Sequence, residues 1–143
     1  MAWLRAALLL CLLPLMGAKT VADAPAVLLV AHADVATQRL TRDTTRAIFA
    51  MRQRTWPNGQ AARVFVLPND HPVHARFTKE RLAVYPHQLQ LAWDRMVFSG
   101  TGQAPDRARN QAEMRDLIAT TPGAVGYLER EYLDERIQVI TMD

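Results

Sequence analysis

Serine and cysteine are almost absent from this chain of 143 residues. Ser99 is the only serine and Cys11 is the only cysteine. A Ser-His-Asp or Cys-His set therefore has almost no nucleophile to draw on, and the six glycines form no phosphate-cradling loop. The sequence predicts no catalytic residues, and we expect the protein not to be an enzyme.

An apolar run long enough to cross a membrane is also missing, but a shorter run opens the chain. Residues 6–16 are uninterruptedly apolar, follow Arg5, and are followed by small residues. A membrane span needs about 20 such residues. The pattern is typical of a secretory signal peptide. We expect cleavage after Ala22, which removes residues 1–22 and sends residues 23–143 to the periplasm as one domain; an uncleaved anchor is the less favoured alternative.

The expected cleavage also changes the cysteine content and the net charge of the exported chain. Cys11 lies inside the apolar run, so the exported chain has no cysteine and depends on its hydrophobic core. Loss of Arg5 and Lys19 lowers the basic residues from 17 to 15 against 14 acidic ones, a net charge of about +1. The remaining arginines are dispersed among acids, which predicts no nucleic-acid partner.

The remaining sequence alternates between strand and helix patterns. Apolar runs predict strands at 26–31, 62–67, 124–128 and 136–141, and helical spacing predicts helices at 41–51, 73–84, 86–98 and 110–120. Thr41 is the expected N-cap of the first helix. The helix over 86–98 has more apolar residues than one stripe needs, so we expect it to be mostly buried. This order predicts a layered α/β fold with a mostly parallel sheet.

In a parallel sheet, ligands bind where loops leave the carboxyl ends of the strands. Two loops qualify by their order in the chain, residues 32–40 and residues 68–72. Trp56, which precedes the turn Pro57-Asn58-Gly59, either closes the core or faces a ligand. We favour packing for Trp56.

Several motifs, taken in order, resemble a known family. They are Leu40-Thr41-Arg42-Asp43, Ile48-Phe49 with Trp56 and Gly59, Phe77, Trp93, Phe98-Ser99-Gly100, and Thr121-Pro122-Gly123-Ala124-Val125-Gly126-Tyr127. Over residues 26–141 the chain resembles one lobe of the phosphate-type periplasmic solute-binding proteins of ABC transporters. The resemblance implies a single three-layer α/β lobe like one lobe of a type II periplasmic binding protein.

The phosphate-binding element of that family is altered here. The resemblance places its Arg-x-Asp-x-Ser-Gly-Thr element on residues 67–73, which read LPNDHPV. Leu67 stands at the position of the arginine, and His71-Pro72-Val73 stand at Ser-Gly-Thr. Pro72 also removes one backbone N–H donor. This implies at most a weakly bound small anion such as phosphate, and a solvated loop that binds no ligand is the slightly favoured alternative.

The expected site is this loop and the helix start behind it. Its candidate anion-binding residues are Asn69, Asp70, His71, His74 and Arg76. A helix N-terminus offers N–H groups to an anion, and His74 and Arg76 add positive charge. Asp70, His71 and His74 can also be read as metal ligands. No further Cys or His cluster completes such a site, so we favour a polar cap and expect no metal and no cofactor.

Two functions follow from these observations. The first is an exported solute-binding-like protein of the phosphate ABC transporter type that acts in anion uptake or sensing, with a membrane transporter as its partner. The alternative is a periplasmic module that recognises a membrane sensor or receptor and has lost its small-ligand site. Glu129, Glu131, Asp134 and Glu135 are expected to form a solvated acidic stretch.

Overall fold

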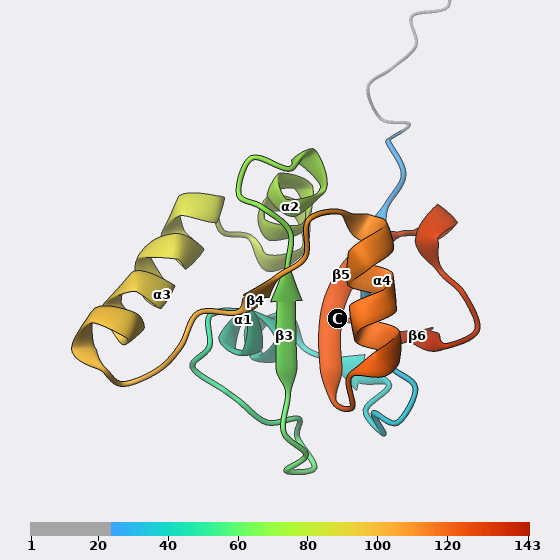
Figure 1. Ribbon diagram of the computed structural model, residues 1–143, viewed down its shortest axis with the longest axis horizontal. Coiled ribbons are helices and arrows are strands. Elements are labelled where there is room, and N and C mark those ends of the chain that lie inside the picture. The colour runs from blue at the N-terminus through green and yellow to red at the C-terminus, as the bar shows by residue number, and fades with distance from the viewer. Residues whose placement is uncertain (1–23) are drawn as a thin grey trace, which may run out of the picture.

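The protein is described here by a computed structural model that covers residues 24–143. The expected signal peptide, residues 1–22, and Cys11 lie outside the described residues. Within residues 24–143, helices lie on both faces of a central sheet (Figure 1). No helix in this range is long and apolar enough to cross a membrane.

The central sheet has five strands, and four of them run in the same direction. Their order across the sheet is β4 (Asp106–Arg107), β3 (Arg63–Val66), β5 (Ala124–Glu129), β1 (Val27–His32) and β6 (Ile137–Val139). β3 pairs in parallel with β4 and β5, whereas β1 is antiparallel to both of its neighbours. The expected mostly parallel sheet is confirmed, with β1 as the one reversed strand.

Two helical layers enclose this sheet. The helical segments are α1 (Arg42–Phe49), α2 (Pro72–Arg76), the π-helix η2 (Phe77–Leu82), α3 (Pro86–Ser99), α4 (Gln111–Thr120) and the 3-10 helix η3 (Arg130–Tyr132). Neighbouring residues of β5 show the two faces. Gly126 faces Ile118 and Met114 of α4, while the ring of Tyr127 stacks on Phe77 of η2. The three-layer α/β fold is therefore confirmed.

Local sequence signals set the helix starts. Thr41 accepts a hydrogen bond from the Thr44 N–H at 3.1 Å, as expected of an N-cap. Asn110 caps α4 in the same way through the Glu113 N–H at 2.8 Å. The expected helix over 73–84 is divided into α2 and η2. The expected strand over 136–141 is divided as well, into β6 and β7 (Thr141–Met142), and β7 pairs in parallel with β2 (Arg39–Leu40).

The expectation that the helix over 86–98 is mostly buried is wrong. In α3 only Leu89 and Trp93 are buried, whereas Leu91, Val97 and Phe98 are 51%, 50% and 87% exposed. The reason is the position of α3, which lies beside the sheet rather than over it (Figure 1). One side of α3 reaches the core, where Trp93 Nε1 donates to the Phe49 carbonyl at 2.8 Å.

Trp56 packs in the core, as expected. It is 1% exposed, and its Nε1 donates to the carbonyl of Gly123 at 2.9 Å. This bond ties the segment after α1 to the residue that precedes β5. The indole therefore closes the core from a loop, with its one polar atom satisfied.

The two loops proposed for a ligand crevice lie at opposite edges of the sheet. Because β1 is antiparallel to β5, and β5 is parallel to β3, the carboxyl ends of β1 and β3 point in opposite directions. The loop after β1 instead meets the residues that precede β5, where Asp34 accepts from the Gly123 N–H at 3.1 Å. Only the loop at 68–72 lies at the edge where the four codirectional strands end.

Candidate functional site

The candidate site is the sheet edge formed by the carboxyl end of β3 and the start of α2. Leu67 is fully buried, and Pro68, Asn69, Asp70 and His71 lead from it into the helix. Asn69 and His71 are half-buried and Asp70 is exposed. The structure therefore places three of the expected residues in one loop but leaves Asp70 in solvent.

The start of α2 has few free donors. The Val73 N–H already donates to Nδ1 of His71 at 3.1 Å, and Pro72 has no N–H. A helix start normally presents several unpaired N–H groups to an anion. Two of them are missing here, so this helix start offers fewer donors than its position alone indicates.

His74 is buried and neutral. Its Nδ1 hydrogen-bonds the hydroxyl of Tyr127, and this hydroxyl accepts from the Leu67 N–H at 2.9 Å. The hydroxyl can donate its own proton to Nδ1 when His74 carries its proton on Nε2. Burial, with smaller contributions from the charges of Arg107 and His71, lowers the pKa of His74 to about 4. His74 thus contributes no positive charge at neutral pH.

Burial also raises the pKa of the Tyr127 hydroxyl above its ordinary range. The tyrosine therefore remains neutral across the physiological pH range. Nε2 of His74 has no hydrogen-bond partner among the described residues. A buried polar atom of this kind is destabilising until it meets a hydrogen-bond partner.

A polar network connects the loop to α3 and β4. The Asn69 amide donates to Oε1 of Gln90 at 2.8 Å, and Arg107 donates to the same oxygen at 2.9 Å. Gln90 in turn donates to Asp94 at 2.8 Å. Arg107, at the end of β4, is therefore the cation of this edge. Sequence reasoning missed it because only the pairing of β4 with β3 brings it here.

Arg76 faces away from this loop. It lies 3.5 Å from Oε2 of Glu129 and donates to the carbonyl of Pro25. Glu129 also accepts from the side-chain amide of Gln111 at 2.8 Å. Glu129 is therefore a half-buried structural partner rather than part of a solvated acidic stretch. Asp134 also departs from that expectation, since it pairs with Arg136 at 2.7 Å.

Asp70, His71 and His74 do not converge on one point. Nδ1 of His71 caps α2, Nδ1 of His74 is bound to Tyr127, and Asp70 is exposed. Among residues 24–143, no group of three or more His, Cys, Asp or Glu side chains has the geometry of a metal site.

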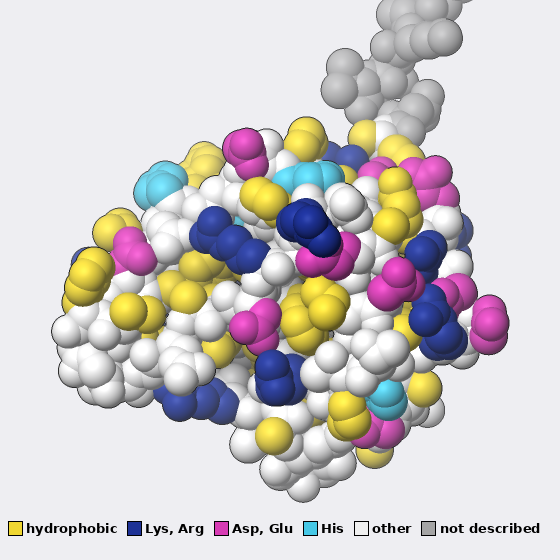
Figure 2. All heavy atoms as spheres, viewed as in Figure 1, with side chains coloured by type: hydrophobic (Ala, Val, Ile, Leu, Met, Phe, Trp, Pro, Cys, Tyr) yellow, Lys and Arg dark blue, Asp and Glu magenta, His cyan; other side chains and the backbone are white. Residues whose placement is uncertain are grey.

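Acidic and basic side chains alternate on the face shown in Figure 2, on which yellow apolar groups also gather toward α3. This distribution agrees with the mixed charges of the sequence. This face therefore shows no wide patch of one sign of charge (Figure 2).

Comparison with known proteins identifies the fold. No family model matches this chain, and no curated protein matches it by sequence. Solved structures do match. A phosphate ABC transporter substrate-binding protein from Clostridium perfringens, solved with bound phosphate, aligns with a TM-score of 0.67 and 13% identity over 82% of this chain and 45% of its own.

Two further structures give the same result. A phosphate transport receptor of the ABC type from Vibrio cholerae has a TM-score of 0.64 and 14% identity over 82% of this chain and 46% of its own. PstS from Borrelia burgdorferi has a TM-score of 0.64 and 10% identity over 83% of this chain and 47% of its own. The chain spans less than half the length of the proteins that it matches, and it has the fold of one lobe of a phosphate transporter's substrate-binding protein.

Proposed function

We propose that this chain is an exported solute-binding-like protein of the phosphate ABC transporter type, which acts in anion uptake or sensing by binding rather than by catalysis. The observation that carries the proposal is the fold, which it shares with proteins described as phosphate receptors. Residues 23–143 form the binding domain in this proposal, and residues 1–22 direct it to the periplasm. An N-terminus that begins at Asp23 in periplasmic protein is the expected mass-spectrometric result.

The anion site that we propose is the edge at residues 68–71 together with Arg107. Arg107 of β4 provides the positive charge. The side chains of Asn69 and His71 come from the loop at 68–71. His74 is neutral and Arg76 is paired with Glu129. One arginine and a few neutral donors supply roughly 4 kcal/mol of binding free energy, because charge-assisted hydrogen bonds contribute about 1.5–3 kcal/mol each. This corresponds to a dissociation constant near millimolar.

Titration calorimetry of residues 23–143 with inorganic phosphate tests this site. We expect a dissociation constant of about 1 mM or weaker at neutral pH, and loss of binding in Arg107→Gln. Arg130→Gln, on the exposed η3, is the matched control and should bind like the wild type. Micromolar binding would overturn the estimate of a weak site, and binding that Arg107→Gln leaves unchanged would place the anion elsewhere.

One observation favours the alternative, a module that recognises a protein. Several large apolar side chains of α3 are exposed to solvent, and exposed apolar patches are typical of protein interaction sites. In this alternative the partner is a membrane sensor or receptor.

A further inference from the structure

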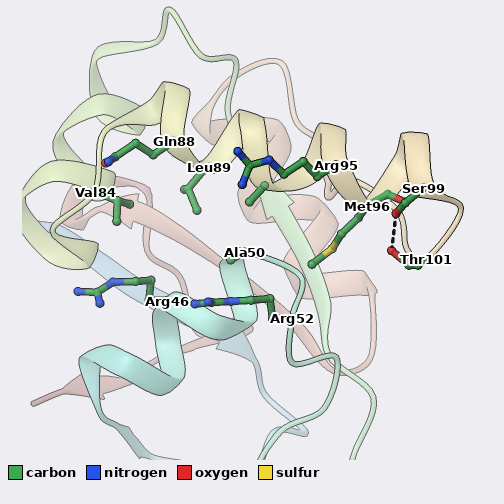
Figure 3. A pocket seen from close by; sticks show the side chains of 11 residues that line it. Arg46, Ala50, Arg52, Val84, Gln88, Leu89, Arg95, Met96, Ser99 and Thr101 are labelled. Atoms are coloured by element: carbon green, nitrogen blue, oxygen red, sulfur yellow. Dashed lines mark hydrogen bonds between the residues drawn. The ribbon is translucent and has the colours of Figure 1, made fainter.

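A groove runs between α3 and the C-terminal end of α1, away from the 68–72 edge (Figure 3). Its volume is about 400 Å³. Apolar side chains line its floor, namely Ala50, Val84, Leu89, Ala92 and Met96. The groove is much larger than a phosphate ion, so its size and lining fit an apolar group.

Three arginines line this apolar groove, and no acidic residue does. Arg46 and Arg52 extend along the α1 wall, and Arg95 comes from α3 (Figure 3). Arg46 is held by the Leu82 carbonyl at 2.8 Å and lies 3.5 Å from Asp43. Arg52 and Arg95 form no ion pair with any residue in the described range 24–143. The groove therefore attracts an anionic group that also has an apolar part.

The walls of the groove are fixed before any partner binds. Trp93 donates to the Phe49 carbonyl, which joins α3 to the end of α1. At the far end, Arg54 donates to the Thr101 carbonyl at 2.9 Å, and Ser99 and Thr101 share a hydrogen bond of 2.7 Å. A preformed groove binds with a smaller loss of conformational entropy than a groove that must first assemble.

Beside the groove, the outer side of α3 exposes two apolar side chains, Leu91 and Phe98, which we call the crest. Leu91, Arg95 and Phe98 follow each other at the spacing i, i+4, i+7, which places them along one stripe of the helix. Leu91 and Phe98 are 51% and 87% exposed. The stripe extends for about 10 Å along the helix. A small molecule inside the groove leaves this crest uncovered, whereas a polypeptide can lie across both.

We propose that the groove and the crest of α3 together bind an acidic amphipathic segment of a partner protein. Apolar side chains of the segment fill the groove floor and cover Leu91 and Phe98, and its carboxylates pair with Arg52 and Arg95. The charge complementarity selects an acidic partner, and the exposed crest selects a polypeptide. This surface lies apart from the anion site proposed above and does not depend on it.

A synthetic peptide tests the proposal with the chain of residues 23–143. The probe is a fluorescein-labelled helical peptide of about 16 residues, long enough to follow α3, with leucines at i, i+3, i+4 and i+7 flanked by glutamates. A second peptide has glutamine in place of every glutamate. Fluorescence anisotropy measures the binding of each. We expect the acidic peptide to bind more tightly and to lose affinity as salt is raised.

Three variants locate the binding, and all three change exposed side chains, so their melting temperatures should match the wild type. Arg52→Ala and Arg95→Ala should each weaken the acidic peptide by roughly 1.5- to fivefold, and Phe98→Ser should weaken both peptides. Arg130→Ala is the matched control and should change neither. Phosphate titration of Arg52→Ala should equal that of the wild type, which separates this surface from the anion site.

Three outcomes would overturn the proposal. The first is absence of binding by the acidic peptide, and the second is equal binding of the acidic and glutamine peptides. The third comes from sedimentation: a wild-type dimer that Phe98→Ser converts to a monomer would show that a second copy of the chain covers this face.

Discussion

Trp56 combines a large buried surface with one satisfied polar atom. Its ring is 1% exposed and its Nε1–H donates to the Gly123 carbonyl. Truncation therefore leaves a cavity and removes one of the two hydrogen bonds that the Gly123 carbonyl accepts. We expect Trp56→Ala to lower the free energy of unfolding by about 3–5 kcal/mol, as measured by urea unfolding of residues 23–143.

Phe98→Ala is the matched control for this prediction. Phe98 is an aromatic residue of similar chemistry but is 87% exposed. Its truncation should change the free energy of unfolding by less than about 0.5 kcal/mol. Equal effects of the two variants would contradict the assignment of Trp56 to the core.

His74 makes the stability depend on pH in a defined window. Burial lowers its pKa to about 4, compared with 6.5 for an ordinary histidine. Between these values the unfolded chain binds a proton that the folded chain does not. Acid therefore favours unfolding, and the free energy of unfolding should fall as the pH decreases from about 6.5 to about 4. Above this window the contribution of His74 is constant.

The variant His74→Gln separates this effect from that of the carboxylates. Glutamine retains an acceptor for the Tyr127 hydroxyl but does not titrate. Urea unfolding at several pH values should give a shallower slope for the variant than for the wild type. Identical slopes would show that other groups, such as Asp34, Asp116 and Asp134 with their lowered pKa values, account for the whole pH dependence.

At the scale of elements, the join between β3 and β5 depends on one glycine. Gly123 has a φ of +74°, and a β-carbon there would lie 2.2 Å from the Ala61 carbonyl oxygen. Gly123 also accepts a hydrogen bond from the Arg63 N–H at 3.1 Å. Gly123→Ala thus adds backbone strain and forces the two segments apart, so we expect it to destabilise the fold by about 3 kcal/mol or more.

Gly100 provides the comparison for Gly123. Its φ is +70°, but a β-carbon there meets nothing within 4 Å. Gly100→Ala should therefore cost roughly 1–2 kcal/mol, the strain of the left-handed backbone alone. Thermal unfolding of both variants measures the difference in stability between them. This difference reports the steric clash between the added β-carbon at residue 123 and the Ala61 carbonyl oxygen. A Gly123→Ala variant no less stable than Gly100→Ala would be inconsistent with that approach.

Local signals in the sequence were sufficient for most of the elements. Apolar runs located β1, β3 and β5, and the Thr41 cap located the start of α1, because these signals involve neighbouring residues. The burial of α3 was predicted wrongly for a physical reason. The same spacing of Leu91, Trp93 and Phe98 suits a helix between two layers or one beside the sheet, and only tertiary packing decides.

The candidate site was only partly accessible from the sequence. The loop at 69–71 could be located from its position after β3, but the charge of His74 and the position of Arg107 could not. The neutrality of His74 depends on burial against Tyr127, and the position of Arg107 depends on the pairing of a two-residue strand. Contacts between residues this far apart in the chain leave no periodic signal.

At the scale of the whole molecule, strand direction decides which loops share an edge. The apolar run of β1 predicts a buried strand but contains no information about its direction, because side-chain alternation is the same in both senses. The reversal of β1 separates the loop at 32–40 from the loop at 68–72. The proposed anion site and the proposed peptide-binding groove both lie on surfaces built from β3, β4, α1, α2 and α3.

The central position of β1 also determines when the chain can fold. The first strand of the sheet lies between β5 and β6, which come from the last part of the chain, and its residues pair with both. A chain that is truncated after Thr120 lacks both β5 and β6, the two neighbours of β1. We expect the amides of residues 27–32 in this truncated chain to be unprotected in hydrogen exchange. Protection of these amides would contradict this view. During synthesis the sheet must then wait for its final residues to emerge. Such a delay keeps the polypeptide unfolded for longer, which suits the export that we propose.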